Sequence, residues 1–154
     1  MSVSRDSVSR MGRAFSLRGR DRIRFLFKQA RRRSGENLTV FYDLRAVESA
    51  RDTQSPDSPS NIRFLVAVPR RTGSAVARNK IRRRLRETFR TWPGRDKLAG
   101  DLIVRYNPPS SKAAGRRTPA PLAERARPDR RLLQALSEDL LETLERVRRQ
   151  IASE

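Results

Sequence analysis

The clearest pattern of hydrophobic and polar positions lies between residues 75 and 92. Small and apolar side chains recur there at steps of three and four, as on one face of an α-helix, with Phe89 at the edge of the stripe. The stripe consists of Ala77, Ile81, Leu85, Thr88 and Trp92. The opposite face, within an arc of roughly 100°, carries Asn79, Arg82, Arg83, Arg86 and Arg90. This pattern predicts a helix that packs on a core by one side and exposes a row of guanidinium groups on the other.

Two other segments show a helical period. From Arg20 to Ala30, apolar residues recur at i, i+3, i+4 and i+7, and the polar run 31–35 is expected to end this helix. The final segment carries a long stripe of Leu133, Leu136, Leu140, Leu144, Val147 and Ile151. We expect this helix to cover a sheet and to present an outer acidic face of Glu138, Asp139, Glu142 and Glu145.

Segments rich in β-branched and aromatic residues predict strands at 38–44, 62–68 and 101–106. Residues 46–61 and 107–128, rich in proline and polar residues, are interpreted as surface insertions. Residues 1–14 are interpreted as a disordered basic arm, which leaves 15–151 as a single domain. The order of the elements predicts a small α+β sandwich with helices over one sheet.

Charge narrows the class of partner. The chain of 154 residues has 36 Lys and Arg against 17 Asp and Glu, a net charge of +19. Repulsion between so many like charges opposes compaction of the chain, so we expect a polyanionic partner that neutralises them. Nucleic acid is the first candidate for this partner, and an anionic membrane surface is the second. No apolar stretch is long enough to span a bilayer. The preference for arginine over lysine fits phosphate recognition and equally fits a genome of high GC content.

The chain contains neither cysteine nor histidine. Disulfides, thiol nucleophiles, thiolate zinc sites and imidazole catalysis are therefore excluded. The lack of cysteine fits the cytoplasm, and residues 1–14 lack the apolar segment of a secretory signal. Asp101 is interpreted as the start of a strand, because no second carboxylate is suitably placed beside it for metal-dependent hydrolysis. We expect no catalytic residue and no metal ligand on the protein.

The run Arg78-Asn79-Lys80, followed by Ile81-Arg82-Arg83 and by Arg86-Glu87-Thr88-Phe89-Arg90, resembles the signature helix of the bacterial ribonuclease P protein component. The resemblance continues upstream in 70–77 and reaches 25–28 and 100–104, so it covers roughly residues 15–107. The resemblance implies a ferredoxin-like sandwich of order α-β-β-β-α-β-α, related to a domain of a ribosomal protein, with a left-handed crossover at the basic helix.

The resemblance also implies a function. Such a protein binds a large catalytic RNA, and together they remove the 5′ leader from precursor tRNA with Mg²⁺, held mainly by the RNA and the substrate. The RNA catalyses this endonucleolytic cleavage, while the protein binds the leader and strengthens metal binding by the complex. We expect a cytoplasmic monomer, one per RNA, that does not bind a membrane.

The resemblance also assigns candidate site residues, by their positions in the matching motifs. The positions that match the family's RNA-binding helix and the basic pair before it, together with Arg90 at the end of the signature run, are Arg70, Arg71, Arg78, Asn79, Lys80, Arg82, Arg83, Arg86 and Arg90. Those assigned to its leader-binding cleft are Ile23, Phe27, Lys28 and Phe41. Lys80 replaces the family's usual arginine, Ile23 a frequent phenylalanine and Ala30 a usual glycine.

Alternatives remain at this point. Phe27 and Phe41 fit a hydrophobic core as well as a stacking platform, and 31–33 fit a functional patch as well as a solvated turn. A structural ribosomal protein would have the same composition and fold class, but the full Arg-Asn-Lys signature favours the ribonuclease P subunit. A basic-zipper DNA reader needs a continuous helix, which Pro93 and Gly94 interrupt.

Overall fold

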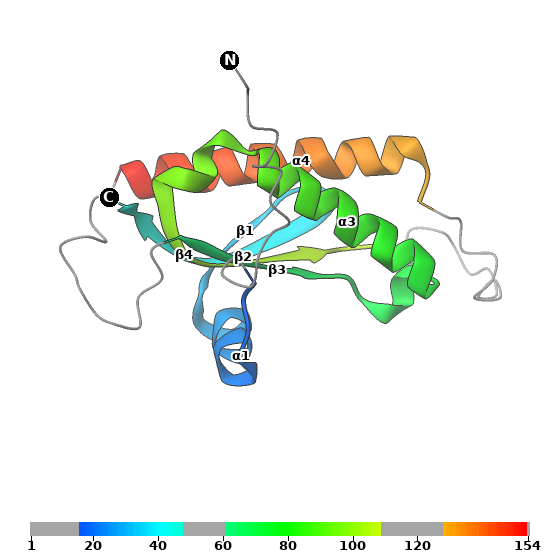
Figure 1. Cartoon of the computed structure of the whole chain (residues 1–154), viewed down its shortest axis with the longest axis horizontal. Helices are drawn as coiled ribbons and strands as arrows, with labels where there is room; N and C mark the ends of the chain where they lie inside the picture. The colour runs from blue at the N-terminus through cyan, green and yellow to red at the C-terminus, as the bar shows by residue number, and fades with distance from the viewer. Residues whose placement is uncertain (1–15, 48–60, 109–127, 154) are drawn as a thin grey trace, which may run out of the picture.

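The computed structural model describes residues 16–47, 61–108 and 128–153. They form a four-stranded sheet with two long helices on one face and a short helix on the other (Figure 1). In chain order the elements are α1 (Arg20–Gln29), β1 (Arg31–Ser34), β2 (Leu38–Ala46), β3 (Ile62–Ala67), η2 (Arg70–Thr72), α3 (Ala75–Thr91), η3 (Pro93–Lys97), β4 (Leu98–Tyr106) and α4 (Arg130–Ala152), where η marks a 3-10 turn. This order confirms the predicted α+β class.

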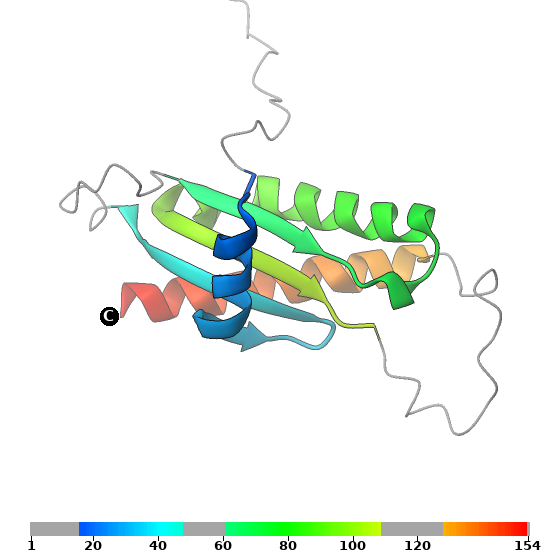
Figure 2. The ribbon, with the colours of Figure 1, turned by 90° about the horizontal axis from the view of Figure 1, so that it is seen from below.

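The strands lie in the order β1-β2-β4-β3, so the last strand of the chain is inserted between the second and the third. β2 pairs antiparallel with β1 and with β4, whereas β3 and β4 run parallel. Parallel neighbours need a crossover, which α3 supplies. In Figure 2, β3 and β4 both point to the right, β4 lies below β3, and α3 returns behind the sheet. This connection is left-handed, against the usual right-handed rule.

Alternation along the strands separates two apolar layers. Even-numbered residues of β2, β3 and β4 pack against α3 and α4 in the main core, and those that are buried are Leu38, Val40, Tyr42, Ile62, Phe64, Val66, Leu98, Leu102, Val104 and Tyr106. Phe64 stacks on Phe89 of α3, with ring centroids 4.1 Å apart. The predicted apolar stripe of α4 lines the same core.

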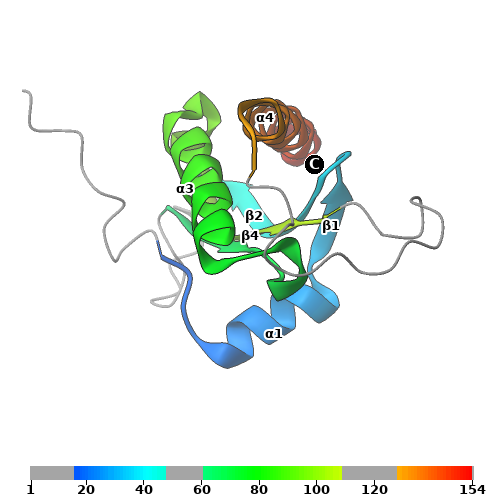
Figure 3. The same ribbon diagram turned by 90° about the vertical axis from the view of Figure 1, so that its right-hand side faces the viewer.

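Odd-numbered residues of the same strands face α1. Of these, Phe41 and Ile103 form a smaller buried cluster with Leu17, which precedes α1, and with Leu26 of α1. Ile23, Ala30, Leu65 and Ala67 pack against this cluster. Figure 3 shows α1 alone on this side of the sheet, with α3 and α4 together on the other. The sheet is therefore the middle layer of the sandwich.

The run Arg31–Ser34 follows the end of α1 at Gln29, as expected, but it forms the edge strand β1 with all four side chains exposed. With β2 and β3 it completes the three strands before the basic helix that the family resemblance implied. None of its four residues is apolar, so no hydrophobic alternation marks this strand, and backbone pairing with β2 defines it. The predicted basic arm and the greater part of both predicted insertions lie outside the described residues.

Strand β4 begins at Leu98 and not at Asp101, so the prediction of its start was wrong by three residues. Gly100 lies in this extension with a φ of +130°. A Cβ atom there would come within 2.1 Å of the backbone oxygen of Asp43 on β2. The close approach of the two strands therefore requires glycine at this position.

The predicted acidic outer face of α4 is only half correct. Glu138 and Glu142 are exposed, but Asp139 accepts hydrogen bonds from the backbone N–H groups of Glu36 and Asn37 at 3.1 and 2.7 Å. Glu145 accepts a hydrogen bond from Trp92 Nε1 at 2.8 Å. Two of the four acids thus hold α4 against the β1–β2 turn and against the end of α3.

Candidate nucleic-acid interface

Helix α3 is fixed on the core along the predicted stripe. Ala77, Ile81, Leu85, Thr88 and Phe89 are buried, and Trp92 is buried immediately after the helix. Ser74 caps the N-terminus by accepting a hydrogen bond from the backbone N–H of Ala77 at 3.2 Å, which satisfies one of the free donors there. The buried stripe therefore sets which residues of α3 face solvent.

The outer face of α3 carries the predicted guanidinium row. Asn79, Arg83 and Arg86 are exposed, and Arg82 and Arg90 are partly exposed. Arg82 Nη1 donates to Asn79 Oδ1 at 3.1 Å, and Arg90 Nη2 lies 3.3 Å from Glu87 Oε2. Within the described part of the chain, Arg83 and Arg86 have no side-chain partner. These two guanidinium groups are fully available to an external anion.

Other basic side chains of α3 have contacts within the protein. Arg78 Nη1 donates to the Gly73 carbonyl at 2.6 Å, and Lys80 Nζ donates to the Pro128 carbonyl at 3.2 Å. Arg84 Nε donates to Ser137 Oγ on α4 at 2.7 Å. Arg78 and Lys80 were predicted from the sequence to bind RNA, and in the structure each donates a hydrogen bond to a backbone carbonyl of the protein itself.

The basic pair Arg70 and Arg71 forms most of η2, directly before α3, and both residues are exposed. Gly73 then turns the chain with a φ of 143° so that Ser74 reaches its capping position. The pair therefore extends the basic face beyond the N-terminus of α3, where the helix dipole also favours an anion.

The residues assigned to leader binding lie on the other side of the sheet, around α1. Phe27 on α1 and Phe41 on β2 form an edge-to-face pair with ring centroids 5.0 Å apart. Phe27 is 37% exposed and Phe41 only 7%, so Phe27 presents the larger part of this pair to solvent. Ile23 is half-buried and packs into the cluster under α1, while Lys28 is exposed. Phe27 thus packs against a buried ring and also exposes part of its own ring to solvent, so it fits both a core residue and a stacking platform.

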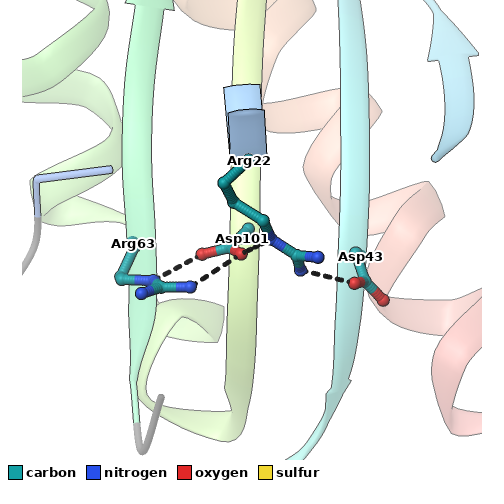
Figure 4. Close-up of polar contacts among 4 residues, drawn as sticks. All are labelled: Arg22, Asp43, Arg63 and Asp101. Carbon is teal, nitrogen blue, oxygen red and sulfur yellow. Dashed lines mark hydrogen bonds and ion pairs between the residues drawn. The ribbon is translucent and has the colours of Figure 1, made fainter. Parts of the chain in front are cut away.

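An ion-pair cluster around one buried carboxylate fastens α1 to the sheet (Figure 4). The Asp101 carboxylate is fully buried; its Oδ2 lies 2.5 Å from Arg22 Nε of α1 and its Oδ1 lies 2.6 Å from Arg63 Nε of β3. Arg22 Nη2 also lies 2.6 Å from Asp43 Oδ2 on β2. Burial lowers the pKa of Arg22, but the hydrogen bonds to Asp101 and Asp43 raise it by more, so the net shift is upward.

This cluster was not predicted from the sequence, where Asp101 was interpreted as the first residue of a strand. The available signal was the alternation of β3 and β4, which places Arg63 and Asp101 on one face as register partners. Both carboxylate oxygens are held by arginine, so the structure assigns Asp101 to ion pairing. Within the described residues, no group of three or more acidic side chains could hold a metal ion, and no helix is long and apolar enough to cross a membrane.

Solved structures with a similar fold include ribonuclease P proteins. A Staphylococcus aureus RNase P protein, a mutant with defective mRNA degradation activity, is 19% identical with a TM-score of 0.56, over 87% of this chain and 88% of that one. The RNase P protein from Thermotoga maritima is 23% identical with a TM-score of 0.53, over 85% and 96% of the two chains. At these identities the similarity establishes the fold.

The family follows from the sequence. The family model for Ribonuclease P matches residues 11–121, which include α1, the four strands and the basic helix α3. A search of the curated proteins finds no match. The chain therefore belongs to the ribonuclease P protein family.

Proposed function

We propose that this chain binds the catalytic RNA of ribonuclease P through the outer face of α3 and the 5′ leader of precursor tRNA through the surface around Phe27. Membership of the family makes it an RNA-binding subunit of ribonuclease P that acts with the ribonuclease P RNA in tRNA processing. The proposal adds which surfaces serve which RNA, and that one protein monomer serves each RNA.

The exposed guanidinium groups of Arg83 and Arg86 carry this proposal. They have no partner within the described residues, although arginine side chains elsewhere on α3 find one. Arginine donates bidentately to phosphate, and neutralising phosphates releases counterions, which supplies most of the affinity of such interfaces. Arg70, Arg71 and Asn79 extend the same surface.

The two RNA surfaces lie on opposite sides of the sheet. Figure 3 shows α3 on one side and α1 on the other. An exposed aromatic ring suits unpaired bases, because stacking works with any base, whereas a row of arginines suits the phosphates of a folded RNA. The protein is therefore built to contact two segments of RNA at once.

The chemistry falls to the RNA in this proposal. The chain has no cysteine or histidine, and its buried carboxylate Asp101 is held by two arginines. Mg²⁺ would be held mainly by the RNA and the substrate, and the protein would strengthen its binding by screening the phosphates around it.

A reconstitution assay tests the proposal. The chain is mixed with a bacterial ribonuclease P RNA and precursor tRNA, and leader release is followed over a series of Mg²⁺ concentrations. We expect the protein to lower the Mg²⁺ requirement and to tighten binding of the leader-bearing precursor. A protein that changes neither quantity contradicts the proposal. Binding to a ribosomal RNA fragment with higher affinity would instead favour a structural ribosomal protein.

A further inference from the structure

Helix α1 crosses the strands and divides this face of the sheet into two flanks (Figure 2). Arg22 and Phe27 are five residues apart, about 140° around the helix on either side of Leu26, whose side chain is buried. Along β4, Asp101 and Arg105 lie two residues to either side of Ile103, which packs under α1. Arg22 with Asp101 thus marks one flank, and Phe27 with Arg105 marks the other.

The flank of Asp101 offers little to a polyanion. Its ion-pair cluster contains two arginines, Arg22 and Arg63, and two aspartates, Asp43 and Asp101, so the four charges sum to zero. Both guanidinium groups donate to carboxylates at 2.5 to 2.9 Å. The exposed ring on this flank, Phe25, already lies under Arg22, whose guanidinium carbon is 5.0 Å from the ring centroid.

The flank of Phe27 carries two exposed arginines that flank Phe41. Arg32 is the partner of Phe41 across the β1–β2 pair, and Arg105 lies two residues beyond Ile103, the partner of Phe41 across the β2–β4 pair. Directly opposite side chains have Cβ atoms about 5 Å apart and diagonal neighbours about 7–8 Å, within reach of a long side chain. Both side chains therefore begin next to Phe41 and are long enough to reach the aromatic pair.

Neither arginine has another contact to maintain. Arg32 and Arg105 are exposed, and within the described part of the chain neither forms a hydrogen bond or an ion pair. An arginine beside an aromatic platform binds the phosphate of a nucleotide whose base contacts the ring, and its plane can itself stack on a base. This flank thus has both parts of a site for single-stranded nucleic acid.

We infer that Arg32 and Arg105 bind phosphates of a single-stranded RNA segment whose bases contact Phe27. The strand lies on the Arg105 flank of α1 and leaves the flank of Asp101 uncovered. The inference rests on the proposed binding of the leader, and it adds the flank and two contact residues that the family signature does not supply.

The test compares two variants of equal charge in the complex with a bacterial ribonuclease P RNA. One carries Arg32→Gln and Arg105→Gln, and the control carries Arg146→Gln and Arg149→Gln on the exposed side of α4. The dissociation constant is measured against salt for precursor tRNA with a long leader and for the same tRNA with its leader shortened to one nucleotide. Circular dichroism on each protein checks that the fold is intact.

We expect the first variant to reduce the gain in affinity from the leader by about 10-fold. Loss of two phosphate contacts on a single strand should also lower the slope of log K against log salt by about 1.4 for the long-leader substrate. The control should keep both values, and Arg32→Lys with Arg105→Lys should keep most of the slope because the charges remain.

Each other outcome is decisive. If the wild type gains affinity from the leader and the first variant keeps that gain and its slope, the inference is wrong while the proposed function stands. An equal loss in the α4 control would assign the effect to net charge and would also overturn the inference. A wild type that gains nothing from the leader overturns the proposed leader binding together with the inference.

Discussion

Arg22 on α1 donates from Nε to Oδ2 of Asp101 on β4 over 2.5 Å, joining residues 79 positions apart in the chain. Arg63 on β3 holds the same carboxylate from the other side. Helix α1 has only a small apolar cluster beneath it, so this shared carboxylate is the polar half of its attachment to the sheet.

Replacing that carboxylate should therefore destabilise the fold. Asp101→Asn removes the negative charge between two arginines and leaves their donors poorly satisfied. We expect a loss of about 3 kcal/mol in the free energy of unfolding, measured by urea denaturation. Asp96→Asn is the control, since that carboxylate is 78% exposed in its pair with Arg95, and it should cost less than about 1 kcal/mol. Equal costs would show that burial of the Asp101 carboxylate has no energetic consequence.

Acid should weaken the contact between α4 and the end of α3. Hydrogen bonds from Trp92 Nε1 and from Arg148 hold the pKa of Glu145 below its usual value of 4.5. The unfolded chain then takes up this proton at a higher pH than the native one, so the stabilisation is complete above about pH 4.5 and is lost as the pH falls through the native pKa.

The measurement for Glu145 is the unfolding free energy of the wild type and of Glu145→Gln between pH 3 and pH 7. The difference between the two proteins should be largest at neutral pH and should shrink below about pH 4.5. A difference that is constant over this range would mean that the charge of Glu145 does not contribute.

The outer face of α3 should control the salt dependence of RNA binding. Arg83→Ala with Arg86→Ala removes two guanidinium groups of α3 that have no partner among the described residues. The slope of log K against log salt for the ribonuclease P RNA should therefore fall by about 2. Arg146→Ala with Arg149→Ala removes the same charge from α4 and should leave the slope nearly unchanged. An unaltered slope in the α3 variant would place the RNA elsewhere on the protein.

Two phenylalanines on α1 offer a matched comparison. Phe25 and Phe27 are 38% and 37% exposed, but Phe25 lies by Arg22 and Phe27 pairs with Phe41. Phe27→Ala should weaken binding of the leader-bearing precursor by about 1–3 kcal/mol, the value of one stacked base. Phe25→Ala should leave it close to wild type, and the reverse ranking would contradict the assignment of the leader to the Phe27 side.

A structural feature can be predicted from the sequence when the residues that cause it lie close together in the chain. The helix α3, its buried stripe and its exposed row are set by a 3.6-residue period within seventeen residues, so the sequence alone predicts them. The hydrophobic pattern does not mark β1, because its four polar residues carry no period and its pairing with β2 depends on a turn held by Asp139 of α4. Only the family resemblance implied a third strand before α3.

The residues of the candidate site also differ in how far the sequence predicts their contacts. Exposure of Arg83 and Arg86 follows from the helical stripe, whereas the engagement of Lys80 with Pro128 joins residues 48 positions apart and has no local signal. The Asp101 cluster unites α1, β2, β3 and β4, so its members become recognisable as a group only when the strand order is known.

The central position of β4 has a consequence for biosynthesis. β2 and β3 do not pair with each other, and β4 is the strand that joins them. A nascent chain that ends before Leu98 would contain the β1–β2 hairpin and β3, but the edges of β2 and β3 that pair with β4 would be unpaired. The sheet can close only after residue 106 has left the ribosome, and such late, non-local pairing slows folding and exposes strand edges to aggregation.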